Sequence, residues 1–212
     1  MRTANARPTL IVMVKDPMPG RVKTRLGRDI GMSTAAWWFR HQTQRLIRNT
    51  RDRRWQSVLA LAPDRAVATS RNWPADLWRT PQGIGDLGGR MTRALQYAMP
   101  GPVLLIGGDI PGITALRVAR AFRTLKHHDA VLGPAPDGGF WCIGLAGPLM
   151  PRNLFANARW STEHALLDTL VSLHGKRVAL TETLSDVDII DDLAPGAIHA
   201  TPLSIHETGV SP

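Results

Sequence analysis

The first apolar run of the chain, residues 9–14, constrains the fold most. It is short, rich in branched aliphatic residues and does not alternate with polar ones, a pattern typical of a strand buried on both faces of a parallel sheet. Comparable runs follow at 56–62, 102–106 and 140–145, separated by loops and helical stretches. Alternating strands and helices predict an α/β three-layer α/β/α sandwich with a mainly parallel mixed sheet.

The expected elements follow from periodicity and from turn residues. The segment 15–31 is rich in glycine and proline and is expected to be a loop, while 65–76 is ambiguous. We expect helices at 33–49, 86–99, 114–126 and 161–173, and strands at 9–14, 56–62, 102–106, 130–132, 140–145 and 177–180.

We expect one domain at 8–195, followed by a tail at 196–212 with little periodicity, although this length also allows two small domains. Cys142 is the only cysteine, so no internal disulfide can form. No apolar run approaches the roughly 20 residues that span a bilayer, and the apolar stretch near the start is too short for a signal-peptide core. We therefore expect a cytoplasmic protein without membrane attachment.

The loop after the first strand carries a cluster of groups suited to phosphate. Gly20 lets backbone amides approach an anion, Lys23 supplies a point charge, and Arg25 a planar fork. Thr24 adds a hydroxyl, and Lys15 lies at the end of the strand. The spacing is neither that of a P-loop nor that of a dinucleotide fingerprint. An exposed basic turn is the alternative interpretation.

Asp109 follows the apolar strand at 102–106 and lies between Gly108 and Ile110. A carboxylate in that place suits Mg²⁺ or Mn²⁺, which bind oxygen ligands and keep waters and substrate phosphates. The alternative is an Asp that caps the next helix or closes a turn.

Asp186 and Asp188 lie on alternate positions after the last strand, so their side chains can share a face. Either one could complete the metal site that Asp109 begins, and Asp188 is preferred. A solvated turn explains the same pattern.

Three further groups are candidates for substrate binding. Asp137, Gly138 and Gly139 join two expected strands, although Asp-Gly is also a common hairpin signal. Trp160, Ser161 and Thr162 open an expected helix, where Ser161 as a plain N-cap is favoured. Asp86 and Arg90 open another helix, whose amides could meet an anion; capping alone also explains Asp86.

The net charge is +9, with +10 in residues 1–60 and −4 in residues 121–212. This asymmetry suits a phosphate site facing a metal site, and it also suits nucleic-acid binding. A solvated, arginine-rich surface is a third explanation. No nucleic-acid-binding motif is present, which counts against the second one.

Several ordered blocks of the chain resemble the bacterial DUF2064 proteins, described as transferases associated with radical-SAM/selenodomain proteins and often labelled glycosyltransferases. These blocks lie at 15–26, 85–91, 108–111, 133–139, 160–162 and 186–188, across most of the chain. The resemblance implies the nucleotide-diphospho-sugar transferase superfamily with a GT-A-type fold. It also implies that Lys23 and Arg25 hold phosphates and that Asp109 holds the metal.

The function implied is metal-dependent transfer from a nucleotide-activated substrate to a small acceptor. Glycosyl transfer from a nucleotide sugar is ranked first, narrowly, because of the family label. The Lys-Thr-Arg loop looks more like the triphosphate grip of a nucleotidyltransferase, similar to the guanylyltransferases of the superfamily. A basic nucleic-acid-binding or ligand-binding protein without catalysis is the alternative of another class. The oligomeric state stays open, with a dimer as one option.

Overall fold

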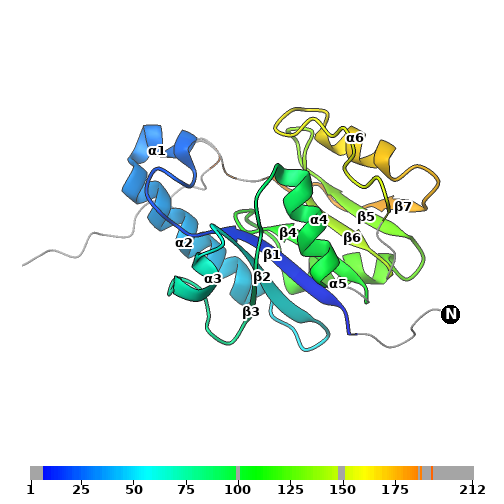
Figure 1. Cartoon of the computed structure of the whole chain (residues 1–212), viewed down its shortest axis with the longest axis horizontal. Helices are drawn as coiled ribbons and strands as arrows, with labels where there is room; N and C mark the ends of the chain where they lie inside the picture. Colours follow the sequence, from blue (N-terminus) through cyan, green and yellow to red (C-terminus); the bar gives the residue numbers. More distant parts are fainter. Residues whose placement is uncertain (1–6, 99–100, 148–150, 186, 188–191, 193–212) are drawn as a thin grey trace, which may run out of the picture.

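The computed structural model describes residues 7–98, 101–147, 151–185, 187 and 192. Its helices and strands alternate along the chain as an α/β protein requires (Figure 1). In chain order they are β1 (Thr9–Lys15), α1 (Thr24–Ile30), α2 (Met32–Asn49), β2 (Gln56–Ala62), α3 (Ala66–Thr69), β3 (Trp78–Pro81), α4 (Leu87–Tyr97), β4 (Val103–Gly107), α5 (Ala115–Thr124), β5 (Ala130–Pro134), β6 (Phe140–Leu145), α6 (Ala165–Ser172) and β7 (Val178–Leu180).

A single mixed sheet of these strands has the order β3-β2-β1-β4-β6-β5-β7. The strands β3, β2, β1 and β4 pair in parallel, β6 is antiparallel to both β4 and β5, and β7 is parallel to β5. The prediction of a mainly parallel mixed sheet is therefore confirmed.

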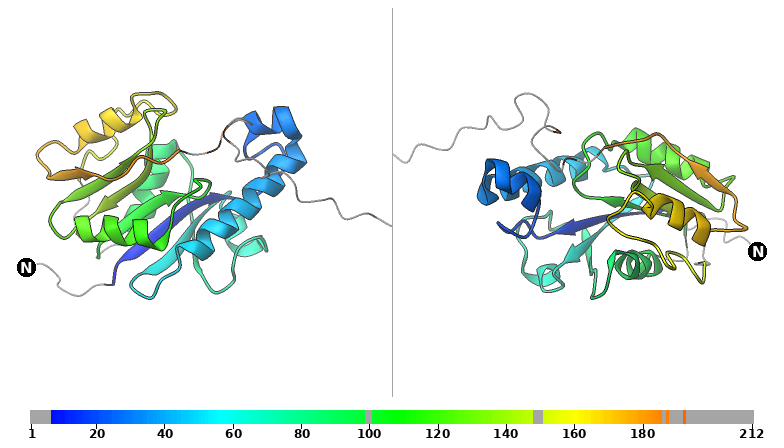
Figure 2. Two further views of the ribbon diagram at one scale, coloured as in Figure 1. Left: turned by 180° about the vertical axis from the view of Figure 1, so that it is seen from behind. Right: turned by 90° about the horizontal axis from the view of Figure 1, so that it is seen from above.

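Helices cover both faces of the sheet, with α2 and α5 on one face and α4 and α6 on the other (Figure 2). Successive residues of β1 serve the two faces in turn, as a strand buried on both sides demands. Leu10 belongs to the apolar cluster that contains Leu46 of α2 and Val118 of α5. Ile11 belongs to the cluster that contains Met91 and Leu95 of α4. The apolar run of β1 does not alternate with polar residues because both of its faces are buried, as the sequence predicts.

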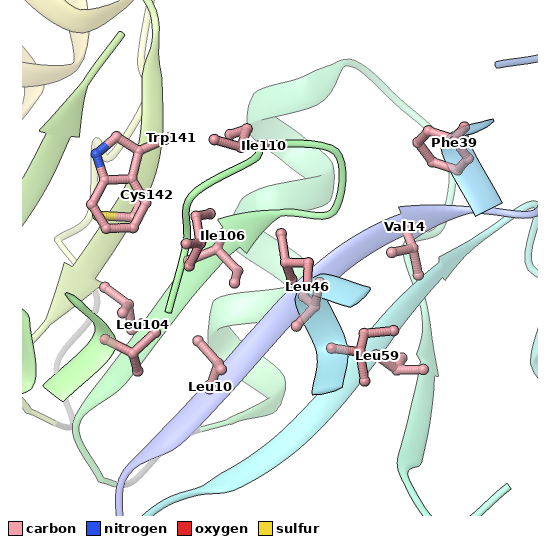
Figure 3. Packing of buried hydrophobic residues seen from close by; sticks show 14 of the residues in the cluster. Leu10, Val14, Phe39, Leu46, Leu59, Leu104, Ile106, Ile110, Trp141 and Cys142 are labelled. Carbon is pink, nitrogen blue, oxygen red and sulfur yellow. The ribbon is translucent and has the colours of Figure 1, made fainter. Parts of the chain in front are cut away.

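The larger cluster extends along the sheet to the ends of its strands (Figure 3). Leu46 and Leu59 lie deep in it, whereas Val14, Phe39 and Trp141 also face a cavity at the sheet edge. Because these side chains are fixed by packing, the floor of that cavity is rigid.

The topology gathers the ends of several strands at one edge of the sheet. Parallel β1, β3 and β4 end there at Lys15, Pro81 and Gly107, and antiparallel β6 begins there at Phe140. Open α/β sheets bind their ligands at this edge.

Three local predictions were wrong. Residues 24–30 form helix α1 rather than loop, since Leu26 is fully buried against the core. Strand β3 was missed because it has only four residues and follows an irregular segment. Helix α6 begins at Ala165, with His164 at its N-cap, so Ser161 is not the cap of that helix.

Among the described residues, no helix is long and apolar enough to cross a bilayer. The proposed tail at 196–212 lies outside the described residues, as do Asp186 and Asp188. The single-domain boundary at 8–195 stays a prediction.

Candidate functional site

A cavity of about 580 Å³ opens at the edge where β1, β3 and β4 end. Its lining includes the loop from β1 into α1, the β4–α5 loop, the first turn of α4 and the loops flanking β6 and α6, together with Phe39 of α2 and Gln82 after β3. Of the sequence-predicted site residues, it brings together Lys15, Lys23, Thr24, Arg25, Arg90, Asp109, Asp137, Gly139, Trp160, Ser161 and Thr162.

Lys23 and Asp109 form an ion pair inside this cavity. The distance from Lys23 Nζ to Asp109 Oδ2 is 2.8 Å, and the two side chains are 6% and 29% exposed. The predicted phosphate-binding lysine and the predicted metal-binding carboxylate are thus in direct contact. Because the Lys23 side chain is almost fully buried, salt screens this pair less than it would screen a pair on the surface.

The backbone of Lys23 is itself unusual. Its φ of 44° and ψ of 49° lie in the left-handed region, where lysine is uncommon, and it occupies the N-cap of α1 without a side-chain cap. Ser161, on the opposite wall, has a φ of 61°. Backbone strain of this kind costs about 1–3 kcal/mol per residue and collects at functional sites.

Asp16 anchors the loop that carries Lys23. Its Oδ1 accepts hydrogen bonds from Ser70 Oγ at 2.6 Å and from Asn72 Nδ2 at 3.0 Å. Asp16 N–H also donates to Ala62 O at 2.7 Å, which ties the loop to the end of β2. The start of the loop that carries Lys23 is therefore fixed by the neighbouring chain segment.

Gly108 positions Asp109. A side chain at Gly108 would meet the backbone oxygen of Met13 at 2.9 Å and would also strike Val14, so only glycine lets the β4–α5 loop lie this close to β1. That close approach brings Asp109 to the end of β1, within reach of Lys23.

Gly138 joins the β5–β6 connection to the segment before α6. Its φ is 80°, and a Cβ there would collide with the carbonyl of Glu163. Its own carbonyl accepts a hydrogen bond from Leu166 N–H at 2.9 Å. Gly138 does not line the cavity, and its requirement for glycine is explained by this contact. Asp137 does line the cavity, and its Oδ1 accepts from Gly139 N–H at 2.9 Å.

An aromatic cluster of Phe140, Phe155 and Trp160 supports the far wall. The ring centroids of Phe155 and Trp160 are 5.5 Å apart at 65°, an edge-to-face arrangement, and Phe140 contacts both rings. Trp160 packs against Gly88 of α4, where a Cβ would meet its ring at 2.8 Å. Trp160 is therefore held at the rim of the cavity.

Asp168 of α6 braces the segment that carries Trp160. Its two carboxylate oxygens accept from Arg159 Nε and Nη2, each at 2.9 Å, and Oδ2 also accepts from Arg159 N–H at 2.9 Å. These hydrogen bonds lower the pKa of Asp168 to about 2. Thr162 Oγ1 donates to Arg159 O at 2.7 Å, so this hydroxyl already has a partner.

Two predicted site residues lie elsewhere. Asp86 caps α4 by accepting from Gly89 N–H at 2.8 Å, and it does not line this cavity. Gly20 also lies outside the lining of the cavity. Its φ of 73° explains why glycine occupies this position.

Sequence reasoning missed Gln82, which is 2% exposed and lines the cavity. Its signal was weak, because it follows a four-residue strand that was itself not predicted. Cys142, expected in the core, is 1% exposed, and burial raises the pKa of its thiol.

The fit of a divalent metal rests on Asp109 among the described residues. Within the described part of the chain, no three His, Cys, Asp or Glu side chains form a metal cluster. Mg²⁺ is often held by one or two carboxylates together with substrate phosphates. Asp109 contacts Lys23 in a cavity that Lys15 and Arg25 also line, which suits an ion that arrives with a phosphate ligand.

Comparison with family models gives a match over residues 46–162 to "Uncharacterized protein conserved in bacteria (DUF2064)", more than half of the chain. The chain belongs to this family. The comparison with curated proteins finds no match.

Among solved structures, a candidate nucleotide-diphospho-sugar transferase from Desulfovibrio desulfuricans G20 is similar. It is 28% identical, with a TM-score of 0.77 over 87% of this chain and 84% of that one. This chain therefore has a nucleotide-diphospho-sugar transferase-like fold.

Two more distant structures share the fold. Rv0371c from Mycobacterium tuberculosis H37Rv, solved in complex with manganese, is 18% identical, with a TM-score of 0.53 over 88% of this chain and 96% of that one. The 4-diphosphocytidyl-2C-methyl-D-erythritol synthase from Anaerococcus prevotii DSM 20548 is 9% identical, with a TM-score of 0.52 over 87% and 94%.

Proposed function

We propose that this protein is a metal-dependent transferase that takes its substrate as a nucleotide-activated group, in the first instance a sugar from a nucleotide diphospho-sugar. The observation that carries the proposal is the Lys23–Asp109 ion pair, 2.8 Å long, inside a cavity that also contains Lys15 and Arg25. The similarity to the Desulfovibrio protein supports this class.

The cationic side chains would bind the diphosphate. Three cations, Lys15, Lys23 and Arg25, face the same cavity, and each can form charge-assisted hydrogen bonds to phosphate oxygens. Thr24 adds a hydroxyl from the first residue of α1. Phosphate at this position would replace Asp109 as the anionic partner of Lys23.

Asp109, released from Lys23, would bind Mg²⁺ or Mn²⁺. A bound divalent ion stabilises negative charge on phosphate oxygens. The residues of the chain orient the donor so that its diphosphate can leave as charge develops on it.

The opposite wall would hold the acceptor. Trp160 is fixed by its ring contacts, and Arg90 lines the cavity with its Nε buried and without a hydrogen-bond partner among the described residues. In the reaction, the acceptor oxygen forms a bond to the anomeric carbon, and the bond from that carbon to the diphosphate breaks. The diphosphate leaves with the electron pair, and the acceptor proton passes to solvent.

Nucleotidyl transfer is the second candidate, supported by the number of cations. Lys15, Lys23 and Arg25 together supply more positive charge than a diphosphate ester needs when a divalent ion is also bound. In this reaction, a phosphate oxygen of the acceptor would form a bond to the α-phosphorus of a triphosphate, and pyrophosphate would leave.

A thermal-shift screen tests the class of ligand. The protein is heated with nucleoside triphosphates and with nucleotide sugars, each with Mn²⁺ and with a chelator. Stabilisation by nucleotide sugars that requires Mn²⁺ supports the first candidate. Mn²⁺-dependent stabilisation by triphosphates, with none by nucleotide sugars, supports the second. No metal-dependent shift with any nucleotide refutes both.

The leaving group then identifies the reaction. With a stabilising donor and a mixture of small acceptors, release of nucleoside diphosphate indicates glycosyl transfer. Release of pyrophosphate indicates nucleotidyl transfer. The chelator-treated protein is the control, since neither product should form there.

A further inference from the structure

Two large aromatic side chains are exposed at the end of the sheet opposite the cavity described above. Trp78, the first residue of β3, is 77% exposed, and Tyr97, the last residue of α4, is 68% exposed. Both line a hollow of about 410 Å³, whose lining also includes Thr9 and Gln56 at the starts of β1 and β2. Single exposed apolar residues are common, whereas two large aromatic ones beside one hollow are typical of an interaction surface.

The hollow has an apolar floor. Trp78 pairs with Val58 of β2, and Val58 pairs with Ile11 of β1, so these side chains form one row on the face of the sheet that α4 covers. Ala94 of α4 and Ala98 at its C-cap complete the apolar lining with small side chains. An apolar cavity of about 150 Å³ already admits benzene, so this hollow has room for an aromatic side chain.

The free edge of β3 is a poor template for a further strand. Gln82 N–H donates to Leu61 O of β2, and backbone groups alternate between the two sides of a strand. Arg79 and Pro81 are therefore the outward positions of β3. Proline has no N–H, so Arg79 carries the only outward donor of this strand. A partner at this surface must be held by side chains and not by strand addition.

The composition around the hollow is that of a protein interface. Arg7 and Arg79 also line it, and their guanidinium groups donate to backbone carbonyls of their own chain. They give the apolar centre a polar rim, as interfaces between proteins have. Trp, Tyr and Arg are also the residues that contribute most to the energy of such interfaces.

The same surface carries a projecting ring and a hollow that can receive one. An interface with two-fold symmetry requires this self-complementarity, because each copy presents the same residues to the other. We propose that two copies of this chain form a two-fold dimer through this surface, with Trp78 of each copy in the hollow of the other.

The exposed aromatic area is large enough to matter for such a dimer. Buried aromatic side chains contribute about 150–250 Å² each, so Trp78 and Tyr97 of two copies supply on the order of 600 Å². A stable interface buries about 1,200–2,000 Å² in total. The four rings therefore supply roughly a third to a half of that area, before the residues around the hollow are counted.

The dimer leaves the proposed catalytic cavity of each copy open. The hollow lies at the starts of β1, β2 and β3, whereas the cavity lies at the opposite ends of the parallel strands. The inference therefore stands independently of the proposed function.

Sedimentation equilibrium over a series of protein concentrations tests the inference. The unaltered protein should form a dimer with a dissociation constant in the micromolar range or below. Trp78→Ala should weaken association by about 100-fold or more, because each dimer loses two central rings. Trp37→Ala is the matched control, since Trp37 is also exposed but lies on α2, and it should leave the dimer intact.

A second measurement locates the surface in the unaltered protein, in case Trp78→Ala does not fold. Hydroxyl-radical labelling, read by mass spectrometry, is carried out at concentrations where the protein is monomeric and where it is dimeric. Trp78 and Tyr97 should be labelled several-fold less in the dimer, and Trp37 should be labelled equally in both.

Three results would overturn the inference. One is a protein that stays monomeric at every concentration. Another is a dimer that Trp78→Ala leaves intact or that Trp37→Ala weakens as much. The third is a dimer in which Trp78 and Tyr97 are labelled as strongly as in the monomer.

Discussion

Lys23 Nζ lies 2.8 Å from Asp109 Oδ2, so the two groups that the sequence assigns to phosphate and to metal neutralise each other. Lys23 is almost fully buried and its backbone is left-handed, both of which carry a cost in the folded state. The contact explains how a buried lysine is tolerated before a ligand arrives. In the function we propose, a phosphate takes the place of Asp109 beside Lys23, and a divalent ion takes the place of Lys23 beside Asp109.

A double-mutant cycle measures the strength of this contact in the absence of ligand. Lys23→Met, Asp109→Asn and the combined variant should give a coupling energy of about 1–3 kcal/mol in urea unfolding, below that of a fully buried pair because Asp109 is partly exposed. Additive single effects would mean that the pair contributes nothing to stability.

Removal of the loop cations should weaken nucleotide binding. Lys23→Met combined with Arg25→Ala deletes two charge-assisted contacts, so affinity for a nucleoside diphosphate should fall by about 100-fold or more. Calorimetric titration measures it. Arg28→Ala is the matched control, since Arg28 lies exposed in the last turn of α1 and outside the cavity. If Arg28→Ala reduced nucleotide affinity as much as the double variant does, binding would depend on the general positive charge of the surface and not on a specific site.

Gly138→Ala should destabilise the fold by about 2 kcal/mol or more, because it places a Cβ against the Glu163 carbonyl at a positive φ. Thermal unfolding gives the measurement. Gly147→Ala is the control, since a Cβ there has nothing within 4 Å. If both substitutions change the unfolding midpoint alike, the contact with the segment before α6 is not a constraint.

The Arg159–Asp168 contact predicts a pH dependence at the acid end. The pKa of Asp168 is lowered to about 2 in the folded state. Its contribution to stability is therefore complete above the unfolded-state pKa of about 4 and is lost as the pH falls toward 2. Asp168→Asn should be less stable than the unaltered protein at pH 6, and the difference in unfolding midpoint should narrow between pH 4 and pH 2. A difference that does not change across this range would contradict the assignment.

Secondary-structure elements could be predicted from the sequence wherever the local residue pattern agrees with the packing of that element in the fold. The run in β1 lacks alternation because the sheet is covered on both faces, and that cause can be deduced from one strand. Helix α4 was found through Asp86, whose side chain caps it as the spacing indicates.

The parts that were missed depend on contacts between distant segments. Ser161 resembles a helix cap by type, yet its backbone is left-handed and α6 begins only at Ala165, after a segment in which Glu163 packs against Gly138. Gln82 carries no motif, and its place at the cavity results from hydrogen bonds to β1 and β2. Such relationships have no local signature.

The most direct test of the central claim is calorimetric titration of a nucleoside diphosphate into the unaltered protein and into Asp109→Asn, each with and without Mn²⁺. Asn keeps an oxygen for Lys23 but loses the negative charge that attracts the metal. We predict that Mn²⁺ tightens nucleotide binding by about 10-fold or more in the unaltered protein, within the usual range of coupling between two ligands, and by less than about 2-fold in Asp109→Asn. An equal gain from Mn²⁺ in both proteins would contradict the account.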